Sequence, residues 1–209
     1  MTLFDFIDQP VSTGVGFPDD HVVLDVEATG FDPRRAFIVD MAAYRFVDGK
    51  LVEQIDTLIG IPPKVRISNS HVHGITAADL VEAPPIWDVA PHLLRLLFGT
   101  SAVVGHSVGF DLRHISAGIA RGRNPRRLPD LPTYDTMEMA RQVWRNAKGH
   151  RLEDCCQRIG VDTTGAHRAG VDVGNTELLF QYLCGQMGPA VRTMGHRSTH
   201  DRITPARSA

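Results

Sequence analysis

Two carboxylates lie two residues apart in an apolar segment near the start of the chain, where residues 21–27 read His-Val-Val-Leu-Asp-Val-Glu. The β-branched residues predict a strand, and side chains two apart in a strand project from the same face. Asp25 and Glu27 would repel each other unless a positive charge lies between them, and hard divalent cations prefer carboxylate oxygens. The pair therefore indicates a metal site, with two ordinary acids on a solvent-facing strand edge as the alternative.

Three more residues could take part in the same chemistry. Asp111 follows a short apolar segment and should lie at a strand-to-helix corner, where it could bind a ligand or simply cap the helix. His167 and Asp172 are five residues apart and would not share a helical face, so we expect His167 in a loop and Asp172 in the first turns of the next helix. An ordinary histidine pKa of about 6.5 suits a general base. The alternative is that His167 is an ordinary surface histidine, because the chain has 10 histidines.

An α/β fold must position these residues. The Asp48-Gly49 dipeptide predicts a tight hairpin, so the first three strands should form an antiparallel meander. Strands that later alternate with helices predict a mixed sheet with helices on both faces. Pro91 predicts a kink or a late start in its helix. Strands are expected at 21–27, 36–47, 51–59, 101–105 and 133–135. Helices are expected near 76–80, 86–97, 110–119, 136–147, 152–159 and 170–183.

The composition bounds the class of protein. The chain has 209 residues, 43% of them hydrophobic, and a formal net charge of -2, which fits one folded domain and excludes a histone-like basic coat. No apolar run approaches the ~20 residues of a membrane helix, no secretory leader is visible, and three cysteines make no disulfide framework. We expect a cytoplasmic protein without a membrane partner. The expected division is an N-terminal extension (1–20), a catalytic domain (21–185) and a flexible polar tail (186–209).

Four motifs in order then carry a resemblance. Asp-x-Glu-x-Thr-Gly begins at Asp25, Gly-His-Ser-x-x-Phe-Asp ends at Asp111, Asp-Thr follows at 135–136, and His-Arg-Ala-x-x-Asp ends at Asp172. This combination resembles the DnaQ-like 3′–5′ exonucleases of the DEDDh type, over residues 21 to about 184. The resemblance implies the ribonuclease H-like fold, an α/β fold in which a three-stranded antiparallel meander and two parallel strands form one sheet flanked by helices.

The resemblance also implies a mechanism. Asp25, Glu27, Asp111 and Asp172 would hold two divalent cations, Mg²⁺ or Mn²⁺, and His167 would take the proton from the attacking water. Asp25 would bridge the ions, Glu27 and Asp172 would complete the first site, and Asp111 would support the second. The partner would be a nucleic acid with a free 3′ end, from which nucleoside 5′-monophosphates are released.

Substrate contacts are implied for segments beside these residues. Phe31, or an apolar residue near 73–75, would stack on the terminal base. The family's usual Thr and Asn are replaced here by Ala28 and Ser107, and neither change removes an acid or the histidine. The implied substrate-binding residues are Ala28, Thr29, Gly30, Phe31, His73, Gly74, Ile75, His106, Ser107 and Phe110.

Several alternatives stay open. The enzyme could act on single-stranded DNA in proofreading or repair, like the epsilon subunit of DNA polymerase III, or it could trim RNA. It could also be a non-catalytic module or a subunit of a polymerase complex, although residues 186–209 contain no Gln-x-x-Leu clamp-binding peptide. The arginines of residues 121–127 could bind phosphates or form a solvated loop, and the oligomeric state is open.

Overall fold

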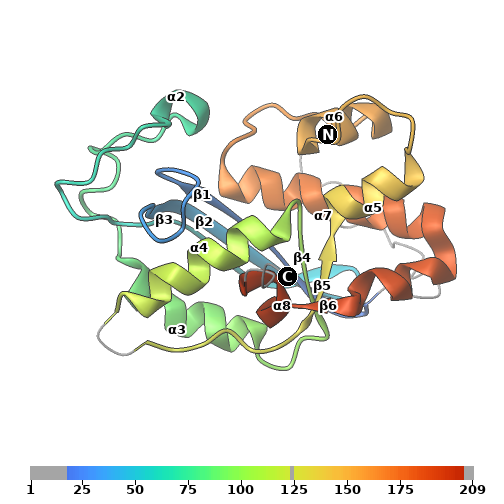
Figure 1. Ribbon diagram of the computed structural model, residues 1–209, viewed down its shortest axis with the longest axis horizontal. Helices are drawn as coiled ribbons and strands as arrows, with labels where there is room; N and C mark the ends of the chain where they lie inside the picture. Colours follow the sequence, from blue (N-terminus) through green and yellow to red (C-terminus); the bar gives the residue numbers. More distant parts are fainter. Residues whose placement is uncertain (1–17, 123–124, 205–209) are drawn as a thin grey trace, which may run out of the picture.

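A mixed six-stranded sheet runs through the residues that the computed structural model describes, 18–122 and 125–204 (Figure 1). The strands are β1 (Asp20–Ala28), β2 (Ile38–Val47), β3 (Lys50–Leu58), β4 (Ala102–Gly105), β5 (Pro132–Asp135) and β6 (Arg197–Ser198). Their order is β3-β2-β1-β4-β5-β6, with β3, β2 and β1 antiparallel and with β4 and β5 parallel to β1. The predicted meander plus two parallel strands is confirmed, and β6 adds an antiparallel edge beside β5.

Helices cover both faces of this sheet. They are α2 (Ser70–His73), α3 (Ile86–Leu97), α4 (Val108–Ala120), α5 (Thr136–Val143), α6 (Leu152–Ile159), α7 (Ala169–Met187) and α8 (Thr199–Ile203), with a 3-10 helix η1 (Gly188–His196). Leu24 and Val26 of β1 pack into a core with α3 and α4, whereas Val23 packs into a second core with α7. Because side chains alternate along a strand, Asp25 and Glu27 lie on the α7 face. Figure 1 shows α3 and α4 on one side of the strands and α5, α6 and α7 on the other.

Two details of the helices differ from the prediction. Helix α3 begins at Ile86 and continues past Pro91, so the expected late start is wrong. Residues 76–80 form turns rather than a helix, because the Asp79 carboxylate accepts hydrogen bonds from the backbone N–H and the hydroxyl of Thr76, both at 2.8 Å. Such side-chain bonds to the local backbone compete with a helix.

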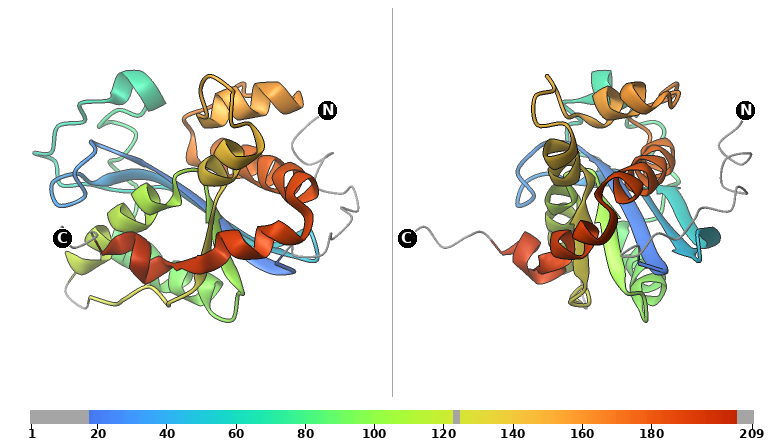
Figure 2. Two further views of the ribbon diagram at one scale, coloured as in Figure 1. Left: turned by 45° about the vertical axis from the view of Figure 1, so that its right-hand side comes forward. Right: turned by 90° about the vertical axis from the view of Figure 1, so that its right-hand side faces the viewer.

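The predicted flexible tail is wrong for the part of it that the structure describes. Residues 186–204 continue α7 and then form η1, β6 and α8, which lies against α4 (Figure 2). Thr199 is buried, and its hydroxyl donates to the Pro129 carbonyl at 2.6 Å. The buried Arg202 guanidinium donates to both oxygens of Glu138, at 2.7 and 2.8 Å. The prediction rested on the polar composition of this segment. It was wrong because these polar groups form hydrogen bonds with residues that are distant in sequence. Residues 205–209, like residues 1–17 of the predicted N-terminal extension, lie outside the described part.

All three cysteines are buried and unpaired, and burial raises the pKa of the Cys156 thiol to about 12. Within residues 18–122 and 125–204, no helix combines the length and the apolar character needed to cross a bilayer.

A buried ion pair joins β1 to α7 far from the strand's carboxyl end. His21 Nε2 lies 2.9 Å from Glu177 Oε2, and both side chains are almost fully buried. Burial alone would lower the pKa of His21, but attraction and hydrogen bonding by Glu177 outweigh it, so the pKa is raised above 6.5. His21 therefore contributes stability that is fully present below about pH 6.5 and is lost as the pH rises through its higher folded pKa.

We expect Glu177→Leu to lower the free energy of unfolding by about 3–5 kcal/mol at pH 6, because one partner of a buried pair is left behind. The loss should be smaller at pH 9 than at pH 6, because His21 loses its charge as the pH rises through its folded pKa. Denaturant titration of wild type and variant at both pH values measures this difference. Glu53→Gln, at a more exposed ion pair with His92, serves as the control and should change little. A loss of equal size at the two pH values would contradict the assignment.

Candidate active site

Four carboxylates from three elements meet at the carboxyl end of β1. Asp25 and Glu27 share one face of β1, and Asp172 lies in the first turn of α7. Asp111, in the first turn of α4, accepts a hydrogen bond from the buried Val26 N–H at 3.2 Å. Burial raises the pKa of Asp25, and repulsion from Asp111, Asp172 and Glu27 raises it further, so these three carboxylates lie within electrostatic range of Asp25. The structure thus brings together the four acids that the sequence singled out.

The electrostatics of this cluster favour a bound cation. Burial and then repulsion from Asp172 and Asp40 raise the pKa of Glu27 from 4.5 to about 8. Burial is also the first cause of the raised pKa values of Asp25 and Asp111. Positive charge placed among these groups would stabilise their ionised forms.

His167 lies in the loop before α7, as predicted, and its backbone is held in the left-handed region with φ 65°. Its N–H donates to Asp172 Oδ2 at 3.0 Å, which fixes the loop against the helix. A ring nitrogen of His167 and carboxylate oxygens of Glu27 and Asp172 all lie within 4.8 Å of one another. The imidazole is half-exposed and therefore open to a substrate or water.

Two charged residues that the sequence analysis missed hold this loop in place. Asp40 of β2 lies opposite Glu27 in the strand register and is buried. Its Oδ2 accepts hydrogen bonds from Arg168 Nε at 3.0 Å and from the Ala169 N–H at 3.3 Å, while its buried Oδ1 has no hydrogen-bond partner among the described residues. The sequence signal that could have identified Asp40 is its place as the single acid inside the apolar run 38–43. The positive charge of Arg168 offsets part of the rise in the pKa of Glu27.

A third missed residue is Glu153 of α6, whose Oε1 lies 3.3 Å from His167 Nε2. Both side chains are about half-exposed, so the contact orients the imidazole without burying it. The sequence analysis expected this helix but gave Glu153 no role.

The start of α7 packs tightly against the sheet at Gly170. A Cβ atom there would lie 2.1 Å from Asp56 Oδ2 and 3.0 Å from the Tyr44 hydroxyl, which donates to that same carboxylate at 2.8 Å. Only a residue without a side chain lets α7 approach β2 and β3 so closely.

We expect Gly170→Ala to lower the free energy of unfolding by about 1–2 kcal/mol, because the Asp56 carboxylate must move and its hydrogen bond breaks. Gly185→Ala, in the same helix with no atom within 4 Å of the added Cβ, should instead gain about 1 kcal/mol of helix propensity. Thermal denaturation compares the two. Equal stability of Gly170→Ala and Gly185→Ala would contradict the close approach of α7 to Asp56 and Tyr44. Adding Asp56→Ala to Gly170→Ala should recover part of the lost stability.

The β4–α4 corner positions Asp111 through backbone contacts. Ser107 has φ 69°, a region where Asn is favoured over Ser, and its N–H donates to Asp135 Oδ1 at 2.9 Å. His106 Nε2 donates to the His150 carbonyl, so its Nδ1 accepts from the Thr136 hydroxyl, both at 2.8 Å. Burial lowers the pKa of His106 to about 4. His106 and Ser107, expected to bind substrate, have structural contacts here.

The remaining predicted substrate residues divide into exposed and packed groups. Phe31 is 90% exposed, and its ring lies 6.4 Å from that of Phe110. The Thr29 hydroxyl accepts from the Phe37 N–H at 3.0 Å and closes the loop after β1. This loop follows the buried Ala28, the last residue of β1, and continues through Gly30.

Residues 68–75 lie at the same end of the molecule. Asn69 Nδ2 donates to the Ala28 carbonyl at 2.6 Å, which ties α2 to the end of β1. His73 and Ile75 are buried, with His73 Nδ1 accepting from the Ile75 N–H, and Gly74 ends α2 with φ 74°. Ile75 therefore packs into the protein, and the exposed apolar side chain of this segment is Val72.

A family model described as "RNase_T: Exonuclease" matches residues 22–180, a range that contains the four carboxylates and His167. The chain belongs to this exonuclease family. Among its relatives in the DnaQ-like exonuclease family is "DNA polymerase III subunit epsilon" of Aquifex aeolicus, 34% identical over 165 residues that cover 76% of this chain and 77% of that protein. A "DNA polymerase III PolC-type" of Latilactobacillus sakei is 29% identical over 88% of this chain but only 12% of its own length.

Solved structures show the same ribonuclease H-like exonuclease fold. "Exonuclease X in complex with 5' overhanging duplex DNA" has a TM-score of 0.65 at 24% identity and covers 84% of this chain and 97% of that one. "Crystal structure of E. coli Exonuclease I in complex with a dT13 oligonucleotide" has a TM-score of 0.62 at 15% identity and covers 81% and 42%.

Proposed function

We propose that this exonuclease is a metal-dependent 3′–5′ enzyme of the DEDDh type that releases nucleoside 5′-monophosphates from single-stranded DNA. The observation that carries the proposal is the meeting of Asp25, Glu27, Asp111 and Asp172 beside the His167 loop. DNA is favoured over RNA because the relatives include DNA polymerase III subunits and the structural neighbours include complexes with DNA.

The donor set fits divalent cations. The four acids offer only carboxylate oxygens, the ligands that Mg²⁺ and Mn²⁺ prefer. Burial and mutual repulsion raise the pKa values of these acids, and bound cations would stabilise their ionised forms, which supports the assignment. We assign Asp25, Glu27, Asp111 and Asp172 as the residues that would hold two such ions. When bound, a pair of divalent ions stabilises the attacking and leaving oxygens of an in-line displacement at phosphorus.

Side chains outside the four acids supply proton transfer and contacts to the substrate. His167 takes the proton from the attacking water, a role open to it because its half-exposed imidazole reaches the carboxylate cluster from a loop. Glu153 orients that imidazole. Phe31 offers an exposed ring on which the terminal base can stack, and such stacking tolerates any base.

Digestion of matched single-stranded DNA and RNA, labelled at the 3′ or the 5′ end, tests the proposal. With Mg²⁺ or Mn²⁺ we expect immediate release of 3′-terminal label as mononucleotide from DNA, retention of 5′ label until late, and no reaction in EDTA. Faster RNA digestion would select the RNA-trimming alternative. No digestion of either would reject an isolated enzyme and leave a non-catalytic module or a subunit that works only within a polymerase complex.

A further inference from the structure

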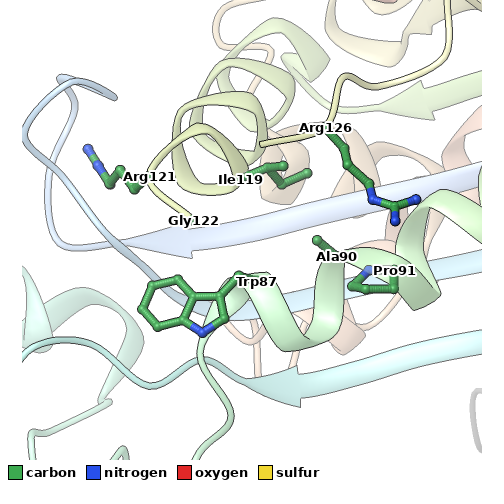
Figure 3. A pocket seen from close by; sticks show the side chains of 7 residues that line it. All are labelled: Trp87, Ala90, Pro91, Ile119, Arg121, Gly122 and Arg126. Carbon is green, nitrogen blue, oxygen red and sulfur yellow. The ribbon is translucent and has the colours of Figure 1, made fainter. Parts of the chain in front are cut away.

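A cavity of about 690 Å³ lies between the first turns of α3 and the end of α4, and no carboxylate of the active site lines it (Figure 3). Its volume falls within the ~300–1,000 Å³ of ordinary ligand sites. We propose that it binds a nucleotide, with the base stacked on Trp87 and a phosphate at Arg126, as a second contact for the strand being degraded. This inference rests on the proposed function. The lining residues used below are Trp87, Ala90, Pro91, Ile119, Arg121 and Arg126.

The lining combines the two chemistries that a nucleotide requires. Trp87 is 49% exposed and presents an indole ring beside the apolar side chains of Ala90 and Ile119. Arg126 is exposed and makes no hydrogen bond or ion pair with any residue in the described part of the chain. Figure 3 shows its guanidinium extended toward Pro91, with Trp87 at the opposite end of the cavity. An aromatic platform and an unengaged guanidinium match a base and its phosphate.

Arg121 connects the cavity to the active site instead of serving as a free cation. Its guanidinium donates to the carbonyls of Ala36 and Pro33, both at 2.7 Å, and lies 4.5 Å from the centre of the Phe37 ring. These residues end the loop that follows β1 and carries Phe31. One loop therefore carries the exposed Phe31, whose ring lies beside that of Phe110, the residue before Asp111, and has its other end fixed to the wall of the cavity.

Helix α4 sets the spacing between the two places. Asp111 lies in its first turn, and Arg121 follows its last residue, ten positions later. At 1.5 Å per residue this is about 15 Å, or about four to five nucleotides of a stacked strand at ~3.4 Å each. A strand of about four to six nucleotides should reach the cavity from the active site, whereas a dinucleotide should not.

Fluorescence of Trp87 tests the proposal independently of catalysis. The chain has two tryptophans, so in the otherwise intact protein Trp144→Phe leaves Trp87 as the single reporter. We titrate oligothymidylates from dinucleotide to dodecamer, and thymidine monophosphate separately, in EDTA so that nothing is hydrolysed. Saturable quenching that begins at about the tetramer to hexamer assigns the cavity to the bound strand. Quenching by the mononucleotide as well shows that a free nucleotide is also accepted.

Two variants extend the test. Trp87→Ala should weaken binding of a labelled octamer by about 5- to 150-fold, the usual worth of one stacked base. Arg126→Gln should weaken it and reduce the slope of log affinity against log salt by about 0.7. Phe98→Ala and Arg192→Gln remove an exposed aromatic ring and an exposed arginine outside the cavity. These control variants should change neither the affinity for the octamer nor the salt slope.

The proposal is overturned if no oligothymidylate or mononucleotide quenches Trp87, or if Arg126→Gln keeps the wild-type affinity and salt slope. The first result would leave the cavity to a ligand of another class. The 3′-end digestion assay is scored separately. An enzyme that degrades strands without quenching rejects the cavity proposal alone, and a protein that shows quenching but never degrades rejects the proposed function alone.

Discussion

Asp25→Asn is expected to lower the rate of hydrolysis by at least about 10³-fold and at the same time to raise the melting temperature of the metal-free protein. The rate falls because Asp25 is one of the four carboxylates that would hold the metal ions, and stabilisation of transition-state charge by bound metal is worth several kcal/mol. Stability rises because the change removes a buried group whose ionisation is opposed by Asp111, Asp172 and Glu27. A gain of about 1–3 kcal/mol corresponds to a shift of roughly 2–12 °C for a chain of this size.

The pH dependence gives this prediction a direction. Glu27 has a folded pKa of about 8 against an ordinary 4.5, so between these values the folded state binds more protons than the unfolded state. The free energy of unfolding of the metal-free wild type should therefore fall as the pH rises from about 4.5 to 8. The raised pKa of Asp25 adds to this fall in wild type and is absent from Asp25→Asn, so the stability of the variant should exceed that of wild type more at pH 8 than at pH 5.

Calorimetry with EDTA or Mg²⁺ measures both effects. Mg²⁺ should raise the melting temperature of wild type at pH 8 and do little for Asp25→Asn. Asp48→Asn, a matched change in the β2–β3 turn, should alter neither activity nor the response to Mg²⁺. A destabilised Asp25→Asn protein, or one with near wild-type activity, would contradict the metal assignment.

His167→Gln is the second large effect, with an expected loss of about 10²–10⁴ in kcat, the usual contribution of a general base. Binding of Mg²⁺, followed by its effect on melting temperature, should persist, since the four carboxylates remain. His92→Gln, on the surface of α3, is the matched control.

Single-turnover digestion of 3′-labelled DNA across pH measures this loss without interference from product release. An unchanged rate would exclude His167 as the base. A lost response to Mg²⁺ would instead make it a metal ligand, which its distance to Glu27 and Asp172 also permits.

The sequence predicted the parts of this structure that depend on local pattern. Alternation along residues 21–27 placed Asp25 and Glu27 on one face, and the Asp48-Gly49 turn predicted the meander. The spacing of five positions from His167 to Asp172 correctly separated a loop histidine from a helical acid. These succeed because strand and helix periodicities fix the direction of a side chain before any packing occurs.

The parts that failed depend on contacts between distant segments. Asp40 and Arg168 are 128 positions apart, and nothing local shows that they form an ion pair beside Glu27. The polar segment 186–204 was expected to be flexible because it has few apolar residues, yet Arg202 is held by Glu138 of α5 and by Asp135 at the end of β5. His106 belongs to the Gly-His-Ser motif, but only the structure shows that both of its ring nitrogens form hydrogen bonds.

Strand β6 has a consequence for any shortened version of this protein. It consists of two residues, yet it caps the outer side of β5, and Arg202 just beyond it reaches the Asp135 carboxylate that also receives the Ser107 N–H. A chain cut at residue 186 would leave an open β-edge that invites self-association. It would also loosen the corner that carries Asp111, so aggregation and reduced hydrolysis should appear together.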